Sequence, residues 1–181
     1  NAAYIDSLRE AKKVLVDELN GTLFTIANDV KIQVEFNPAQ VAEYRLLGYE
    51  TRLLAREDFN NDRIDAGEIG NGHAVTAIYE IVPAAGTYRW VDPLRYGTPE
   101  AEAASGAPGD ELAFLRIRYK LPGEQVSKLI ETPILAGDAL SEIASASDDV
   151  RFAVAVAGWG ELLRGDTRMG TWRIADALKL A

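Results

Sequence analysis

The chain has 181 residues, of which 48% are hydrophobic and 26% are charged, a composition that supports a folded domain with a buried core. Its formal net charge of -9, with no long run of Lys and Arg, argues against nucleic acid as a partner. The absence of cysteine excludes disulfides, thiolate metal sites and cysteine nucleophiles, and no stretch reaches the roughly 20 apolar residues of a membrane span.

The first predicted element is an amphipathic helix over residues 7–20. Ser7 and Glu10 have the spacing of a capping box, and apolar residues follow at helical intervals (Leu8, Ala11, Leu15 and Leu19). Gly21 suits the left-handed conformation in which many helices end. An isolated helix of about three to four turns is marginal in water, so this one needs a surface to pack on.

Two strands are predicted after the helix. Residues 30–36 alternate between apolar and polar side chains, which is the pattern of a half-buried strand, and Asn37-Pro38 ends it. A second extended run covers residues 44–54 and contains Gly48, where a bulge or a close backbone approach is the usual reason for a glycine. We expect these two strands to pair with each other.

A third strand is predicted over residues 74–82, and Pro83 closes it. Residues 83–110 are rich in Ala, Gly, Pro and Glu and form a longer connection than compact domains usually contain. We therefore expect an exposed excursion, with residues 98–109 as its most mobile part.

Two more strands follow, over residues 111–121 and 127–135, joined as a hairpin through Pro122-Gly123. The strands succeed one another through turns, without intervening helices. This order favours antiparallel pairing and a sandwich over a parallel α/β sheet.

The C-terminal part is predicted to be helical. Asp148 and Asp149 suit a helix N-terminus, and Gly165 ends the helix. One face of this helix carries apolar residues (Phe152, Ala155, Val156, Trp159, Leu162 and Leu163). Thr171 is the predicted cap of a shorter helix that carries Ile174, Leu178 and Leu180.

The predicted fold class is therefore α+β: a mainly antiparallel, immunoglobulin-like β-sandwich with an N-terminal helix and a C-terminal helical segment. We expect three regions: an N-terminal region with the helix (residues 1–21), the sandwich (residues 22–136), and a helical segment that packs on the sandwich (residues 137–181). The interior of the sandwich is expected to be plain hydrocarbon, without a prearranged reactive pocket.

The sharpest local pattern lies in residues 58–68, where oxygen-bearing side chains recur as they do in calcium loops: Asp58, Asn60, Asp62 and Glu68. The glycine that such a loop needs after Asp62 is missing, and the flanking segments read as strands. The alternative is a structural turn in which Asp and Asn side chains hydrogen-bond their own backbone. Calcium is the one cofactor that the sequence suggests.

His73 is the only histidine, and it follows Glu68 closely, so these two residues are the one candidate acid–base pair. A lone histidine that begins a strand is more often a hydrogen-bonded surface residue, and no serine stands in a Gly-x-Ser-x-Gly motif. We therefore expect no catalytic residue. Trp159 is expected in the core, whereas Trp90 and Tyr96 of the excursion are candidates for a binding surface.

Segments spread along the chain carry a family resemblance: AYIDSL at 3–8, GTLFTIA at 21–27, VKIQVEFNP at 30–38, DAGEIG at 65–70, FAVAVA at 152–157 and LLRG at 162–165. Together they resemble the C-terminal region of bacterial von Willebrand factor type A proteins of the YfbK type. The resemblance covers nearly the whole chain.

This resemblance implies that the helix of residues 7–20 is the last helix of an upstream von Willebrand A domain, and that the rest is the domain that follows it. The metal-binding Asp-x-Ser-x-Ser motif of the family belongs to the upstream part and is absent here, so no residue of this chain inherits that role. The resemblance also implies an extracytoplasmic location, periplasmic or associated with the outer membrane, as for an envelope lipoprotein.

The combined interpretation is a non-catalytic accessory module that supports protein–protein binding by the full-length molecule. Its expected partners are the upstream von Willebrand A domain of the same polypeptide and an unidentified protein. One alternative is a calcium-stabilised adhesion or scaffold module that uses the loop of residues 58–68. A remoter alternative is a hydrolase that uses Glu68 and His73.

Overall fold

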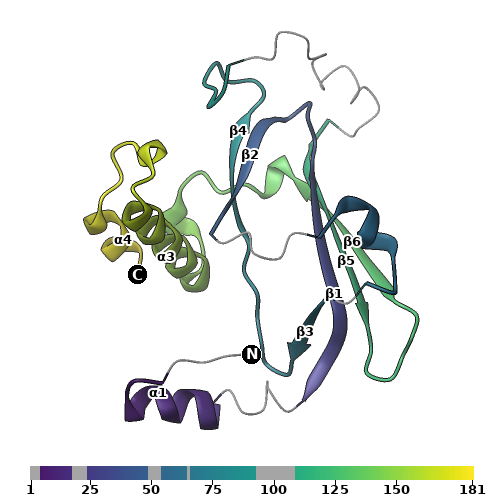
Figure 1. Cartoon of the computed structure of the whole chain (residues 1–181). Helices are drawn as coiled ribbons and strands as arrows, with labels where there is room; N and C mark the ends of the chain where they lie inside the picture. Colours follow the sequence, from purple (N-terminus) through teal and green to yellow (C-terminus); the bar gives the residue numbers. More distant parts are fainter. Residues whose placement is uncertain (1–4, 18–23, 49–53, 65, 93–108) are drawn as a thin grey trace. The chain divides into compact units, whose positions relative to one another are not determined.

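The computed structural model describes residues 5–17, 24–48, 54–64, 66–92 and 109–181 (Figure 1). Its strands are β1 (Thr25–Phe36), β2 (Val41–Leu47), β3 (Gly67–Gly70), β4 (Ile78–Pro83), β5 (Glu111–Lys120) and β6 (Lys128–Leu135). Its helices are α1 (Leu8–Lys12), α3 (Asp148–Arg164) and α4 (Ile174–Leu180). Short π or 3-10 turns are η1 (Lys13–Asp17), η2 (Arg56–Asn60), η4 (Ala136–Asp138), η5 (Ile143–Ser145) and η6 (Thr167–Met169).

The strands form two sheets, one of four strands in the order β3-β1-β5-β6 and one of two strands, β2-β4. β1 pairs with β3 in antiparallel fashion, with Val30 opposite Gly67, and β2 pairs in the same way with β4, with Leu47 opposite Ile78. β5 and β6, the predicted hairpin, are neighbours, and Gly123 in their turn has a φ of 84°. The predicted α+β class with antiparallel strands is confirmed.

The predicted pairing of the first two strands is wrong, because β1 and β2 lie in different sheets. At the turn between them, the side-chain amide of Asn37 donates to the carbonyl oxygen of Glu111 (2.8 Å), which holds the turn against β5. The ring of Phe36 stacks on Tyr44 of β2 at 4.3 Å between centroids and meets Tyr79 of β4 edge-on at 5.3 Å. The end of β1 therefore contacts both strands of the two-stranded sheet through aromatic rings.

The bounds of other strands also differ from expectation. β4 begins at Ile78, and the preceding residues 73–77 are exposed and belong to neither sheet. The ladder of β2 ends at Leu47, and Gly48 has a φ of 114°, a conformation that favours glycine and ends the strand. Residues 93–108, which hold most of the segment predicted to be mobile, lie outside the described residues.

Helix α3 begins and ends where the sequence predicts. The hydroxyl of Ser147 accepts a hydrogen bond from the backbone N–H of Val150, and Asp148 and Asp149 lie in the first turn, where the helix dipole favours negative charge. Gly165 follows the last turn with a φ of 73°, the left-handed conformation of a helix C-terminus. Local signals therefore define this helix completely.

The start of α4 was not predicted correctly. Thr171 lies before the helix, and the N-cap is Arg173. The carboxylate of Asp176, the third helical residue, accepts the backbone N–H of the N-cap Arg173 at 2.9 Å, which is the half of a capping box that an acidic residue supplies.

The N-terminal helix is α-helical only to Lys12 and continues as the π-helical turn η1 to Asp17. The Ser7 hydroxyl accepts the backbone N–H of Glu10 at 3.2 Å, as predicted for the cap. No residue of α1 is buried. Residues 18–23, which contain the predicted stop at Asn20-Gly21, lie outside the described residues.

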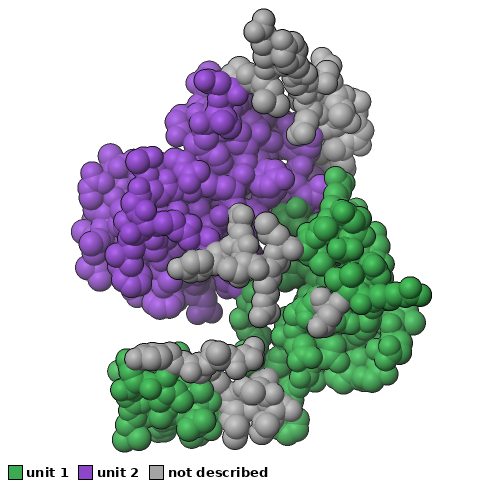
Figure 2. Space-filling view, in the orientation of Figure 1, with its two compact units in different colours: residues 1–34, 54–75, 115–132 green, residues 35–53, 76–114, 133–181 purple. Residues whose placement is uncertain are grey.

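The chain divides into two compact units (Figure 2). Unit 1 comprises residues 1–34, 54–75 and 115–132, and unit 2 comprises residues 35–53, 76–114 and 133–181. The predicted division after residues 21 and 136 stays a prediction. None of the helices in the described ranges is long and apolar enough to cross a membrane.

The described core combines apolar and charged residues. Its buried apolar residues are Val41, Phe59, Val82, Ala113, Ala155 and Ala177. Lys31, Lys120 and Glu161 are buried as well. The expectation of an interior of plain hydrocarbon is therefore wrong, and each buried charge requires partners.

Candidate functional site

The predicted calcium loop lies in unit 1, where Phe59 is buried and anchors η2. After η2, the side-chain oxygen of Asn61 accepts the backbone N–H of Arg63 (3.0 Å), and the carbonyl oxygen of Asn61 accepts the N–H of Ile64 (3.2 Å). This is the structural turn that the sequence left as the alternative to a metal loop.

Two lysine ammonium groups bind oxygen atoms of this loop. Lys31 of β1 donates to the carbonyl oxygens of Asp58 (3.2 Å) and Asn61. Lys120 of β5 donates to the carbonyl oxygen of Asp62 (2.8 Å) and forms an ion pair with Asp29 (2.6 Å). Both lysines are buried, and these bonds offset the cost of removing their charges from water. Main-chain oxygens of the kind that calcium loops use are here bound by the protein's own cations.

Arg118 holds the side-chain oxygens of the same loop. Its guanidinium donates to Asn60 (3.1 Å), to Asp62 (3.3 Å) and to the hydroxyl of Ser127 (3.0 Å). The backbone N–H of Ser127 also donates to the Asp62 carboxylate (3.4 Å). Hydrogen bonds from Ser127 and the charge of Arg118 lower the pKa of Asp62, although loss of solvent acts in the opposite direction.

The four residues predicted to hold calcium thus have separate roles. The main-chain carbonyl of Asp58 binds Lys31, the side chains of Asn60 and Asp62 bind Arg118, and Glu68 is exposed on β3. In the described part of the chain, which leaves out Asp65, no group of three or more His, Cys, Asp or Glu side chains is placed to hold a metal ion. Calcium binding at this loop stays a prediction.

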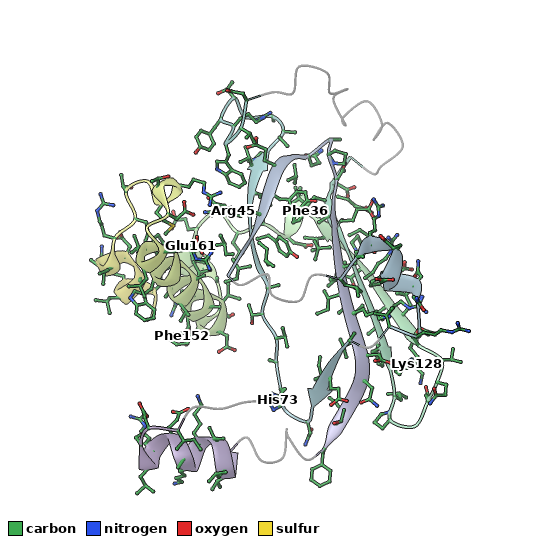
Figure 3. The ribbon with its side chains drawn as sticks, in the orientation of Figure 1. Phe36, Arg45, His73, Lys128, Phe152 and Glu161 are labelled. Carbon is green, nitrogen blue, oxygen red and sulfur yellow. The ribbon has the colours of Figure 1, made fainter. Side chains whose placement is uncertain are left out.

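The candidate acid–base pair lies around the turn after β3. Glu68 is exposed on that strand, and His73 is exposed after the turn (Figure 3). The backbone N–H of His73 donates to the carbonyl oxygen of Gly70 (3.1 Å). Catalytic acids and bases usually owe their shifted pKa values to burial or to a close charge. Two exposed residues at a turn match the surface interpretation better than the catalytic one.

A second charged cluster lies in unit 2, and no local motif in the sequence signals it. Arg45 of β2 pairs with Glu80 of β4 (2.5 Å), with Asp166 after α3 (2.5 Å) and with Glu161 of α3 (3.5 Å). The side chains of Glu161 and Asp166 are only 4% and 5% exposed. Figure 3 shows Arg45 and Glu161 close together. The cluster connects α3 to the β2-β4 sheet.

Two more arginines balance the charge of this cluster. Arg164 pairs with Glu161 (3.3 Å), and Arg168 pairs with Asp166 (2.9 Å). Hydrogen bonds from Arg168 and then Arg45 hold the pKa of Asp166 well below its usual range, although burial raises it. Burial lowers the pKa of Arg45, but the bonds to its carboxylate partners outweigh burial and raise it. Both pKa shifts favour the charged forms of Asp166 and Arg45, which suits a structural role.

The two tryptophans of the C-terminal helical segment, Trp159 and Trp172, differ in their surroundings. Trp159 was expected in the core, but it is about half exposed on α3, so that prediction is wrong. Trp172 instead packs its indole against Gly158 of α3, close enough that a Cβ on Gly158 would clash with it. The indole nitrogen of Trp172 is buried without a hydrogen-bond partner among the described residues.

Trp90, a candidate for a binding surface, is held by β2. Its backbone N–H donates to the carboxylate of Glu43 (2.6 Å), and the guanidinium of Arg45 lies over its ring at 5.7 Å. The start of the excursion is therefore fixed to the sheet. Tyr96, the other candidate, lies outside the described residues.

Apolar side chains of α3 line a groove of about 750 Å³ in unit 2. Its walls include Phe152 and Trp159 from α3 and Ile78 from β4. The charged residues that reach it, Glu161 and Arg164, pair with each other. The lining supplies apolar contact and a neutralised ion pair, which favours binding over catalysis.

Known proteins resemble this chain over most of its length. The family described as "Uncharacterized protein YfbK, C-terminal" matches residues 21–181. Over 165 residues the chain is 46% identical to "Uncharacterized protein YfbK" of Escherichia coli (strain K12), and the alignment covers 91% of this chain and 28% of that protein. The chain thus spans less than a third of the length of this relative. No solved structure shows significant similarity to the chain.

Proposed function

This chain belongs to the family of YfbK C-terminal regions, and from that premise we propose that it is a non-catalytic accessory module of a longer bacterial protein. In that protein a von Willebrand factor type A domain precedes the module, and the complete molecule binds a protein partner. The alignment to only 28% of a longer relative supports a module that works as part of a larger molecule. The family resemblance expected from the sequence segments is confirmed.

The observation that carries this proposal is the helical segment of α1 and η1. Ser7 caps it, yet no residue of α1 is buried, and Leu8, Leu15 and Val16 are exposed. A short helix with its apolar side chains in water gains little stability by itself. These exposed side chains support the proposal that the helix packs against another part of the longer polypeptide. We assign that part to the upstream von Willebrand A domain.

The charged clusters support a non-catalytic role. Arg45 and its carboxylate partners neutralise one another, and Lys31, Lys120 and Arg118 bind the oxygens of the loop after η2. Groups satisfied in this way stabilise the fold and are not poised for proton transfer. We also propose an extracytoplasmic location and no requirement for a cofactor, and both rest on the family resemblance and the sequence.

The test compares three purified proteins: the full-length molecule, the same molecule without residues 21–181, and this chain alone. Each is immobilised and exposed to an envelope extract, and the retained proteins are identified by mass spectrometry. We expect the full-length molecule to retain a partner, the deletion to retain less of it, and this chain alone to retain none. Capture of the same partner by this chain alone would refute a supporting role.

The non-catalytic part of the proposal has its own assay. This chain is incubated with generic ester, phosphate and glycoside substrates, beside a His73→Ala variant as a matched control. We expect no turnover above the rate without protein. Turnover by the chain that disappears in His73→Ala would establish the hydrolase alternative.

A further inference from the structure

The turn that follows β3 has the sequence Gly70-Asn71-Gly72-His73. The backbone N–H of Asn71 donates to the carbonyl oxygen of Phe24 (2.8 Å), and that of His73 donates to the carbonyl oxygen of Gly70 (3.1 Å). Figure 3 labels His73 at the end of the turn. All five residues belong to unit 1, so the bonds that define the turn are internal to that unit.

Two polar groups in this turn have no hydrogen-bond partner among the described residues. They are the side-chain amide of Asn71 and the backbone N–H of Gly72. An asparagine amide has two donors and an acceptor, and their bonds normally fix its orientation. Without such bonds the amide carbon of Asn71 and the nitrogen of Gly72 can approach each other.

Glycine at position 72 removes the steric obstacle to that approach. The amide carbon reaches the next nitrogen by rotation about the Cα–C bond of Asn71, and a side chain on the following residue would hinder it. Gly72 has none, and its φ of 77° shows the wider range that glycine adopts. A Cβ built there meets no heavy atom within 4 Å. The rotation must open only the bond from His73 to Gly70, at the end of a four-residue strand, where local opening costs little.

Two other asparagines, both in or next to β1, lack these features. Asn37 precedes Pro38, which has no N–H to attack with, and its side-chain amide donates to the carbonyl oxygen of Glu111 (2.8 Å). Asn28 lies within β1 and precedes Asp29, whose side chain hinders the approach. Neither position matches the turn after β3.

The two asparagines of the loop after η2 are held by their side chains. The oxygen of Asn60 accepts a hydrogen bond from Arg118 (3.1 Å), and the oxygen of Asn61 accepts the backbone N–H of Arg63 (3.0 Å). These bonds restrain both amide groups. Among the described asparagines, Asn71 therefore combines a free amide, a free neighbouring N–H and a glycine.

We propose that Asn71-Gly72 is a modification site at which the chain converts its own asparagine through a succinimide. The backbone nitrogen of Gly72 loses its proton and attacks the amide carbon of Asn71. A new carbon–nitrogen bond forms, and the amide nitrogen leaves as ammonia. Water then opens the ring: cleavage at the side-chain carbonyl gives aspartate at position 71, and cleavage at the main-chain carbonyl gives isoaspartate. Asparagine is among the thermolabile residues, and water is the only co-reactant.

The product changes the edge of the sheet. Both forms add a negative charge beside β3, which already carries Glu68. Isoaspartate also adds one carbon to the main chain, next to the N–H that donates to Phe24 and close to the pairing of Gly70 with Thr25. We therefore expect isoaspartate to loosen this end of the ladder between β1 and β3. The inference does not depend on the proposed function.

Peptide mass spectrometry of the full-length protein tests the proposal. The folded protein is kept at physiological temperature and pH in water labelled with heavy oxygen, sampled over time and digested. We expect the amide at Asn71 to be lost several-fold faster than those at Asn37, Asn60 and Asn61, with uptake of heavy oxygen. Enzymatic methylation of isoaspartate should label the same peptide. Asn71→Gln is the matched control and should stay unmodified there, because glutamine forms its larger ring much more slowly.

The same incubation in urea separates the effect of the fold from that of the sequence. Unfolding frees Asn60 and Asn61 from their hydrogen bonds, so their rates should rise, whereas the rate at Asn71 should change little. A rate at Asn71 that rises several-fold in urea would show that the fold protects it and would overturn the proposal. Equal rates at Asn71, Asn60 and Asn61 in the folded protein, or aspartate without isoaspartate as the product, would overturn it as well.

Hydrogen exchange measures the expected consequence for β3. The incubated protein should exchange the amides of β3 several-fold faster than the fresh protein does. Asn71→Asp has the charge without the extra main-chain carbon, so it should exchange like the fresh protein. Unchanged exchange in a sample shown to contain isoaspartate would refute the loosening of the ladder.

Discussion

Replacement of Gly158 with alanine tests how α3 packs on the segment before α4. A Cβ on Gly158 would lie 2.7 Å from Cζ2 and 2.8 Å from Cε2 of Trp172. Carbon atoms in contact prefer roughly 3.5–4.0 Å, so the indole or the helix must move by about 1 Å. The backbone N–H of Trp172 donates to the carbonyl oxygen of Met169 (3.0 Å), which restrains that movement.

Two opposing free-energy terms decide the result. Overpacking of a well-packed site costs about 1–3 kcal/mol. Alanine in a helix interior is better than glycine by about 1 kcal/mol. Gly160 lies on the same helix, and a Cβ there meets no heavy atom within 4 Å, so Gly160→Ala has the gain without the clash. Gly158→Ala should therefore be less stable than Gly160→Ala by about 1–3 kcal/mol, which is the overpacking term alone.

Urea unfolding followed by far-UV circular dichroism measures both variants against the parent chain. We expect Gly160→Ala to raise the free energy of unfolding and Gly158→Ala to leave it unchanged or lower it. Trp172→Phe removes the atoms nearest to the new methyl group, so the cost of Gly158→Ala should shrink in that background, as a double-mutant cycle reports. Equal stabilisation by the two alanine variants would refute the packing argument.

Three further predictions concern the charged clusters. Arg45→Ala leaves buried Glu161 and Asp166 with fewer counter-charges and should lower the free energy of unfolding by about 3 kcal/mol in urea titrations. The pKa of Asp166 is lowered in the folded protein. The contribution of this carboxylate to the free energy of unfolding is therefore complete above about pH 4 and is lost as the pH falls toward the folded pKa. The difference in the free energy of unfolding between the parent and Asp166→Asn should shrink in unfolding curves recorded below that pH. Lys120→Met removes the ammonium group that pairs with Asp29 and should lower the free energy of unfolding by about 1–3 kcal/mol, measured by thermal unfolding.

The elements that the sequence predicts well are those specified by neighbouring residues. Ser147, the two aspartates after it and Gly165 define α3 without help from the rest of the chain. The two strands on either side of Gly123 are likewise predicted by their alternating apolar and polar side chains and by the turn residue between them. Pairing was less predictable, because alternation alone does not say which strand is the hydrogen-bonded neighbour. β1 pairs with β3, and β2 pairs with β4.

The charged clusters could not be predicted, since their members are far apart in the chain. Arg45 and Asp166 are 121 positions apart, and nothing near either residue indicates the other. Trp159 shows the related difficulty with a helix face. Its position on α3 places it on the apolar face of the helix, as predicted. The sequence does not show whether other residues pack against that face, and Trp159 is half exposed.

The calcium pattern illustrates why spacing alone underdetermines a ligand. Oxygen atoms of a loop that suit a metal ion also suit cations from a neighbouring sheet. Here Lys31 and Lys120 bind main-chain oxygens of the loop, and Arg118 binds two of its side chains. A calcium ion that displaced Lys120 would leave that buried ammonium without its partners, at a cost of about 3–5 kcal/mol. Each 1.4 kcal/mol is a factor of ten in affinity, so the loop should bind calcium roughly two to four orders of magnitude more weakly than an unobstructed one. A rise in melting temperature on addition of calcium would show that the displaced lysine finds new partners and that this reasoning is wrong.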